Sequence, residues 1–229
     1  MILVFPLLWA AATAAAYFYS QERGIPWSIV LPALPAFLLE ISFYYVAGVE
    51  SLRARLERMP HAGTAAVLLA AATAPYAIAA AAFGNFSWHS FAWIADLAFA
   101  SAFWYVVFPH DTAVDILFLL FVAAVWMSRV IPPLYVTPNP KLSLAVLGQL
   151  MWFRTGLLAM LSVRRMPNIG FGFWPRANEW KIGALWFVGY LPVAAVASWA
   201  VNFARPHLRY DSLERNIVVA IATFFGILW

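Results

Sequence analysis

The chain has 229 residues, of which 65% are hydrophobic and only 10% are charged. Soluble domains carry about a quarter charged residues, so this composition excludes an ordinary soluble fold and indicates an integral membrane protein. The formal charge of +4 does not indicate nucleic acid, because the 14 lysine and arginine residues lie mostly in short gaps between apolar runs. In such gaps they act as topology signals in a lipid bilayer. The absence of cysteine excludes disulfides, thiol catalysis and cysteine-ligated zinc.

About eight continuous apolar segments follow one another, and each predicts a helix because lipid requires every backbone hydrogen bond to be made internally. Continuous runs do not fit a membrane β-barrel, whose strands alternate. The sequence therefore predicts an all-α, polytopic transmembrane helix bundle that forms one integral membrane domain over residues 1–229. The predicted segments are Ile2–Tyr19, Trp27–Val49, Ala62–Phe83, Trp88–Phe108, Thr112–Ile131, Leu142–Val163, Trp180–Phe203 and Ile217–Trp229.

Several segments carry more specific signals. The small residues of the first segment also fit a cleaved signal peptide, but no basic region precedes them. Pro32 and Pro35 predict an early kink in the second segment, and the alanine-rich third segment predicts close packing inside the bundle. The tight turn Pro109–Asp111 predicts that the fourth and fifth segments are antiparallel neighbours.

The last segment, Ile217–Trp229, is too short to cross a bilayer. Thirteen helical residues reach about 20 Å, whereas the hydrocarbon core is about 30 Å thick. We therefore expect this segment to be truncated and the chain to be the amino-terminal part of a longer protein. Asp211 or Ser212, together with Glu214, is predicted to cap this helix.

Charge placement predicts a multi-pass protein of the cell membrane. Arg53, Arg55 and Arg58 lie in one gap, which is the clearest cytoplasmic candidate. Alternating sides carry seven and six basic residues, so the total does not decide the orientation, but the first hairpin favours a cytoplasmic amino terminus. The basic and aromatic loop 168–175 is expected to lie on the membrane surface.

Three ionisable residues fall inside the apolar segments and form the candidate polar binding site. Asp96 lies at mid-depth in the fourth segment, with Ala92 and Ala100 on the same helical face. Arg154 is the basic residue at comparable depth, so the sequence predicts an Asp96–Arg154 pair. Glu40 lies in the second segment. Proton or substrate binding and a purely structural pair or hydrogen bond are both open for these residues.

The other polar motifs give simpler predictions. The sequence Thr112–Asp115 predicts a capping box at a helix start. The histidines His89, His110 and His207 lie at segment boundaries. His110 is close in sequence to Asp111 and Asp115, but no His-Glu-x-x-His spacing occurs, so no metal and no cofactor are predicted. We predict no catalytic residue in the chain.

The carboxyl-terminal third carries a family resemblance. A basic turn, Gly170–Arg176, precedes a helix that opens with Glu179–Gly183, and Phe203–His207 precedes the last apolar segment. This order resembles the region ahead of the catalytic core in the CPBP membrane endopeptidases, which are the CAAX-protease and bacteriocin-processing proteins. The resemblance implies that glutamate- and histidine-activated water attacks a peptide bond of a membrane peptide or protein.

The resemblance covers about 65 residues, from Arg164 onward, and transfers no catalytic residue. In the family, the last helix continues into Glu-Glu-x-x-x-Arg, and Phe-x-x-x-His and a second histidine motif follow. No two acidic residues are adjacent in this chain, and neither His89 nor His110 has phenylalanine four positions before it. The resemblance therefore implies an amino-terminal membrane part without the active site.

Three functions stay open at this point. The first is the amino-terminal region of a CPBP-type intramembrane protease. The second is a transporter or channel-like protein that uses Asp96, Glu40 and the helices kinked at Pro35 and Pro192 as a midplane site. The third is a structural membrane protein without catalysis. The substrate and the oligomeric state are not fixed by the sequence.

Overall fold

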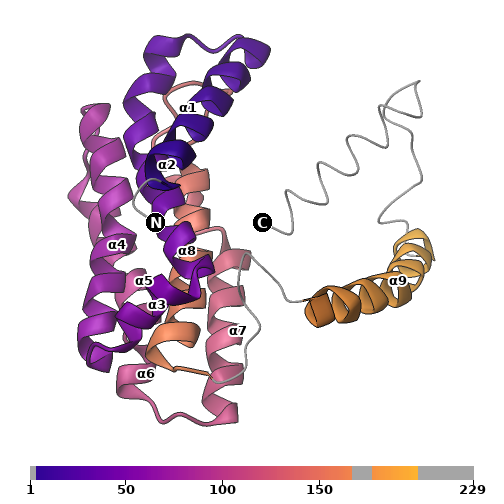
Figure 1. Ribbon diagram of the computed structural model, residues 1–229. Coiled ribbons are helices and arrows are strands. Elements are labelled where there is room, and N and C mark those ends of the chain that lie inside the picture. The colour runs from indigo at the N-terminus through magenta and orange to yellow at the C-terminus, as the bar shows by residue number, and fades with distance from the viewer. Residues whose placement is uncertain (1–3, 167–176, 201–229) are drawn as a thin grey trace. The chain divides into compact units, whose positions relative to one another are not determined.

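A computed structural model describes residues 4–166 and 177–200, where all regular secondary structure is helical (Figure 1). The chain divides into two units, Met1–Ile169 and Gly170–Trp229. The described helices of the first unit are α1 (Val4–Arg23), α2 (Trp27–Gly48), α3 (Glu50–Glu57), α4 (His61–Ala82), α5 (Trp88–Ala102), α6 (Trp104–Val107), α7 (Thr112–Ser128), the 3-10 turn η1 (Pro132–Leu134), α8 (Ala145–Leu158) and the π-helical turn η2 (Ala159–Val163). The second unit contains α9 (Ala177–Ala200).

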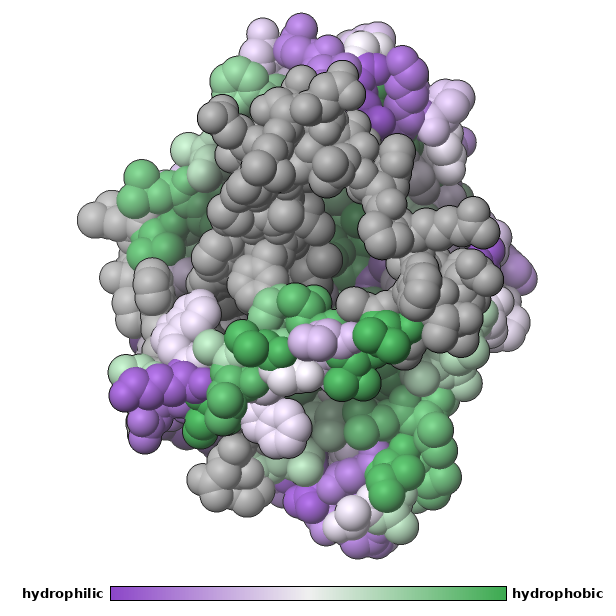
Figure 2. All heavy atoms as spheres, turned by 90° about the vertical axis from the view of Figure 1, so that its right-hand side faces the viewer, coloured by the Kyte–Doolittle hydropathy of each residue, from purple (hydrophilic) through white to green (hydrophobic). Residues whose placement is uncertain are grey.

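The helices fit a membrane protein. Within the described residues, three helices are long and apolar enough to cross a bilayer: Trp27–Gly48, His61–Ala82 and Ala145–Val163. Hydrophobic side chains are abundant on the surface (Figure 2). On α7, four apolar residues between positions 116 and 120 are each more than half exposed, namely Ile116, Leu117, Leu119 and Leu120. A soluble protein rarely exposes an apolar patch of this kind, whereas a lipid-facing helix requires one.

The all-helical prediction is confirmed for the described residues. The second predicted segment is one continuous helix, α2, with Pro32 and Pro35 inside it. The fourth is divided into α5 and α6 at Phe103. The gap that contains Arg53 forms the short helix α3. Loop 168–175, the cap expected at 211–214 and the segment Ile217–Trp229 lie outside the described residues.

Small residues allow the helices of the first unit to pack closely. α8 lies between α4 and α7 (Figure 1) and also contacts α2. The core combines alanines of α2 and α4 with larger side chains of α5 and α8; among its members are Ala33, Ala36, Ala72, Ala79, Ile94, Met151 and Trp152. Alanine brings helix backbones close together, which promotes association where lipid provides no hydrophobic driving force. The third predicted segment, α4, thus packs one face into the interior, while Val67 and Ile78 on other faces are exposed.

Hydrogen bonds tie the loops together at both ends of the unit. Lys141 Nζ donates to the carbonyl oxygen of Arg23 at 2.8 Å, so the loop before α8 lies beside the turn between α1 and α2. Arg165 Nη2 donates to the carbonyl oxygen of Met59 at 2.7 Å, which joins the end of η2 to the start of α4. α2 and α8 therefore begin at the same end of the unit and run parallel to each other.

Helix α8 approaches the loop that precedes it closely at Gly148. The aromatic ring of Tyr135 and the side chain of Ile131 occupy the space that a Cβ atom at position 148 would need. Glycine is required there because any side chain would overlap these two groups.

We predict that Gly148→Ala lowers the free energy of unfolding by about 1–3 kcal/mol, the usual cost of forcing extra volume into a packed core. Gly156→Ala is the matched control on the same helix, because its added Cβ would meet Val122 Cγ2 at 3.4 Å, an ordinary contact. Unfolding of both variants in detergent, followed by circular dichroism, gives the comparison. Equal stability of the two variants would contradict the close approach.

Candidate functional site

The centre of the first unit is a buried ion pair between two helices. Arg154 of α8 donates from Nε to Glu40 Oε1 of α2 at 2.6 Å and from Nη2 to Glu40 Oε2 at 3.1 Å. Both side chains have 0% exposure. This two-pronged geometry matches the planar guanidinium to the carboxylate, which makes it the strongest form of charged hydrogen bond.

A third helix completes the site through its backbone. Arg154 Nη2 also donates to the carbonyl oxygen of Ala71 in α4 at 3.1 Å. In a regular helix this carbonyl would accept from the N–H of residue 75, but residue 75 is proline, which has no N–H. Pro75 therefore leaves the Ala71 carbonyl free of its usual donor, and the guanidinium supplies one instead.

Aromatic side chains of α2 line the pair. The guanidinium carbon of Arg154 lies 4.8 Å from the centre of the Phe43 ring, which adds a cation–π attraction. The Tyr44 hydroxyl donates to the carbonyl oxygen of Leu150 in α8 at 2.8 Å. Phe43 and Tyr44 are three and four residues beyond Glu40 and share one helical face with it, so a single face of α2 makes these three contacts with Arg154 and its helix.

Two polar atoms of the region have no hydrogen-bond partner among the described residues. They are Arg154 Nη1 and the hydroxyl oxygen of Tyr135, and both are buried. Burial raises the pKa of the Tyr135 hydroxyl, and the negative charge of Glu40 adds to the increase. The Tyr135 hydroxyl therefore stays neutral. In the described part of the chain, the Glu40 carboxylate remains the only negative charge that neutralises Arg154.

The predicted Asp96–Arg154 pair is wrong. Asp96 is exposed on the outer face of α5, whereas Ile94, Ala98 and Ser101 face the core. Successive helical residues are about 100° apart, so Asp96 points about 200° away from Ile94 and from Ala98. The prediction placed Ala92 and Ala100 at the contact, but the structure uses the opposite face of the helix.

Depth along the helices did not identify Glu40 as the partner of Arg154. Arg154 is nine residues, or about 14 Å, beyond the start of α8, whereas Glu40 is 13 residues, or about 20 Å, beyond the start of α2. Asp96 is 8 residues, or about 12 Å, beyond the start of α5, so helix depth alone favoured the wrong acid. The overlooked contributor is Pro75, since a proline within a span marks a free carbonyl four residues earlier.

A second ion pair lies where η2 ends. Arg164 donates from Nε to Asp115 Oδ1 at 3.1 Å and from Nη2 to Asp115 Oδ2 at 3.5 Å. The capping-box prediction for Thr112–Asp115 is wrong, because the residue before Thr112 is the cap. Asp111 accepts a hydrogen bond from the N–H of Val114 at 2.9 Å, which leaves Asp115 available for Arg164.

The described histidines fall in two places: His61 and His110 pack edge to face with ring centres 5.5 Å apart, and His89 lies at the start of α5. His89 Nε2 accepts from Trp93 Nε1 at 3.2 Å, and His110 Nε2 lies 2.9 Å from the carbonyl oxygen of Tyr105. His207 lies outside the described residues. Across residues 4–166 and 177–200, no group of three or more His, Asp or Glu side chains is placed to hold a metal ion.

Comparison of the chain with protein-family models, with curated proteins and with solved structures gives no match. What the first unit can do is therefore inferred from the geometry around Arg154. That geometry fixes the rotation of three helices relative to one another, and no water-sized space touches either charged side chain.

We predict that Glu40→Ala or Arg154→Ala alone destabilises the protein by about 3–5 kcal/mol, because each leaves an uncompensated buried charge. The double variant Glu40→Met/Arg154→Met removes both charges while keeping apolar volume, so it should be more stable than either single variant. SDS-induced unfolding measures the four proteins under one set of conditions.

The matched control is Asp96→Ala, which should change stability by less than about 0.5 kcal/mol because Asp96 is exposed. A double variant no more stable than the worse single one, or a large loss in the Asp96 variant, would refute the assignment.

Proposed function

We propose that the chain is a multi-pass protein of the cell membrane and that its first unit is a rigid structural scaffold. We further propose that the scaffold belongs to an intramembrane peptidase of the CPBP type that cleaves membrane peptides or proteins. In this proposal the catalytic residues lie in a part of the protein that the present sequence does not contain.

The main support for the scaffold proposal is the fully buried Arg154–Glu40 pair. A substrate or ion site must open to water or to a ligand, whereas both side chains of this pair have 0% exposure. The guanidinium uses its contacts to join α2, α4 and α8. These properties favour a structural role over a transport site.

The transport alternative requires Asp96 and Glu40 to form one midplane site. Asp96 is exposed on α5, and the Glu40 carboxylate is occupied by Arg154. The two acids therefore lack the shared surroundings that the transport hypothesis assumes.

The peptidase proposal is supported by the resemblance of the carboxyl-terminal third. The sequence Glu179–Gly183, which the resemblance places at the start of a helix, lies in the first turns of α9. The basic turn Gly170–Arg176 and the region from Val201 onward lie outside the described residues.

Cysteine labelling tests the multi-pass arrangement, since the native chain contains no cysteine. We expect single cysteines at Gln21 and Thr137 to react with a membrane-impermeant maleimide from one side, and cysteines at Arg58 and His110 from the other. All four positions are exposed in the structure. Orientation follows from comparing intact cells with inverted vesicles; labelling of all four from one side would contradict the proposal.

The reading frame beyond Trp229 tests the peptidase proposal. We expect a Glu-Glu-x-x-x-Arg motif within the next few helical turns, and substitution of its first glutamate by glutamine in the full-length protein should abolish cleavage of a membrane reporter peptide in proteoliposomes. A stop codon directly after Trp229, or full cleavage by the substituted protein, would rule out this assignment while leaving the scaffold proposal intact.

A further inference from the structure

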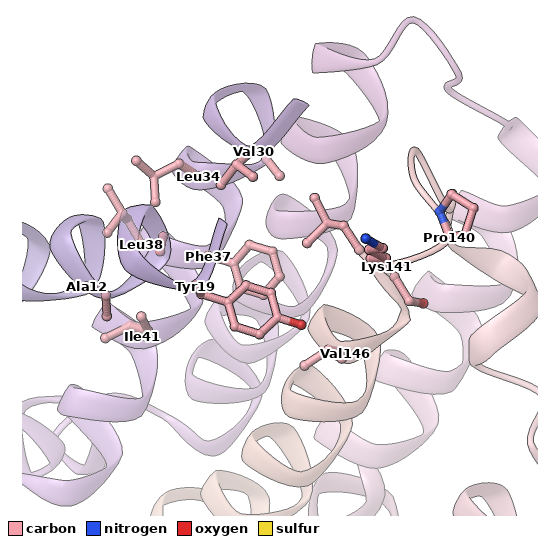
Figure 3. A pocket seen from close by; sticks show the side chains of 15 residues that line it. Ala12, Tyr19, Val30, Leu34, Phe37, Leu38, Ile41, Pro140, Lys141 and Val146 are labelled. Atoms are coloured by element: carbon pink, nitrogen blue, oxygen red, sulfur yellow. The ribbon is translucent and has the colours of Figure 1, made fainter. Parts of the chain in front are cut away.

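An apolar groove lies between α1, α2 and the loop that leads into α8 (Figure 3). It has a volume of about 540 Å³, within the range of small-molecule sites. Its walls are mostly alanine and large apolar side chains, including Ala12, Ala16, Leu34, Phe37, Leu38 and Ile41. Ala12 and Ala16 are one helical turn apart on α1, so their small side chains leave the room that the groove occupies.

One end of the groove is polar and positively charged. Lys141 lies at that end together with Tyr19 (Figure 3), and Ser143 is a further polar lining residue. Among the described residues, the Lys141 ammonium donates one hydrogen bond, to the carbonyl oxygen of Arg23, so two of its three donors are available. The Arg23 guanidinium lies 5.5 Å from the centre of the Tyr19 ring, which places a second cation near the same end. None of the described residues that line the groove is acidic.

The position of this end fits the headgroup layer of a bilayer. Tyr17 and Trp27 pack edge to face, with ring centres 5.5 Å apart, where α1 ends and α2 begins. Aromatic and basic side chains gather in this way at membrane interfaces. From the charged end, the lining runs along α2 from Val30 to Ile41, eleven residues or about 16 Å of helix. One leaflet of the hydrocarbon core is about 15 Å thick.

We propose that the groove binds one acyl chain of an anionic phospholipid and that Lys141 holds the lipid phosphate. The apolar wall matches the chain, its length matches one leaflet, and the cation at the interfacial end selects a negative headgroup. This inference requires a membrane location but not peptidase activity, so its outcome is independent of the peptidase test.

Native mass spectrometry of the full chain in detergent, mixed with phosphatidylglycerol or phosphatidylcholine, tests the proposal. Lys141→Gln should reduce phosphatidylglycerol binding about fivefold, since a lysine near an anionic headgroup contributes about 1 kcal/mol, and should leave phosphatidylcholine binding unchanged. Ala16→Leu should reduce binding of both lipids by filling the groove.

The controls are Arg55→Gln, which removes an exposed cation on α3, and Ala14→Leu, which adds the same volume to α1 at an exposed position outside the lining. Neither should change lipid binding. If Ala16→Leu lowers the unfolding temperature, the lipid binding of Lys141→Gln, at an exposed position, is the test of the proposal. Unchanged lipid preference in Lys141→Gln would overturn the proposal, as would inorganic phosphate stabilising the native protein as well as phosphatidylglycerol does.

Discussion

The first unit depends on the need to neutralise one buried arginine. A guanidinium without water must find an anion and acceptors for its N–H groups, because an unpaired charge in an apolar interior costs several kcal/mol. Arg154 meets most of this need with a carboxylate from α2, a carbonyl from α4 and an aromatic ring from α2. Each partner fixes the rotation of its helix. Apolar packing alone specifies rotation less strictly, since lipid and core side chains are equally apolar.

The alanine-rich helix α4 contributes to this network through a missing hydrogen bond. Its side chains provide few polar groups, so it interacts with Arg154 through its backbone. Pro75 removes one N–H, and the Ala71 carbonyl then accepts from Arg154. The buried Ala71 and Ala72 let α8 approach closely enough for the guanidinium to reach this carbonyl. A proline that would destabilise a soluble helix here becomes part of an interhelical contact.

The sequence predicted the helices well and their facing residues poorly. Apolar runs define segments such as Trp27–Val49 within one residue of α2, because span length is set by the bilayer. The Asp96–Arg154 error has a different origin. Helix rotation decides whether Asp96 or Ile94 faces the core, and alanines on both faces of α5 gave no basis for a choice. The cap of α7 was misplaced by one residue because Asp111 and Thr112 are both good capping residues.

The same arrangement explains how a groove coexists with a rigid core. The ion pair joins α2, α4 and α8, whereas α1 is attached to α2 by lighter contacts, such as the hydrogen bond from Trp9 Nε1 to Ser42 Oγ at 2.8 Å. The groove opens between α1 and α2, and its lining includes none of Glu40, Phe43, Tyr44 and Arg154, so filling it does not displace the charged contacts. Alanine has opposite consequences at the two places. Between α2 and α4 it permits close packing, and between α1 and α2 it leaves space that a lipid chain fits.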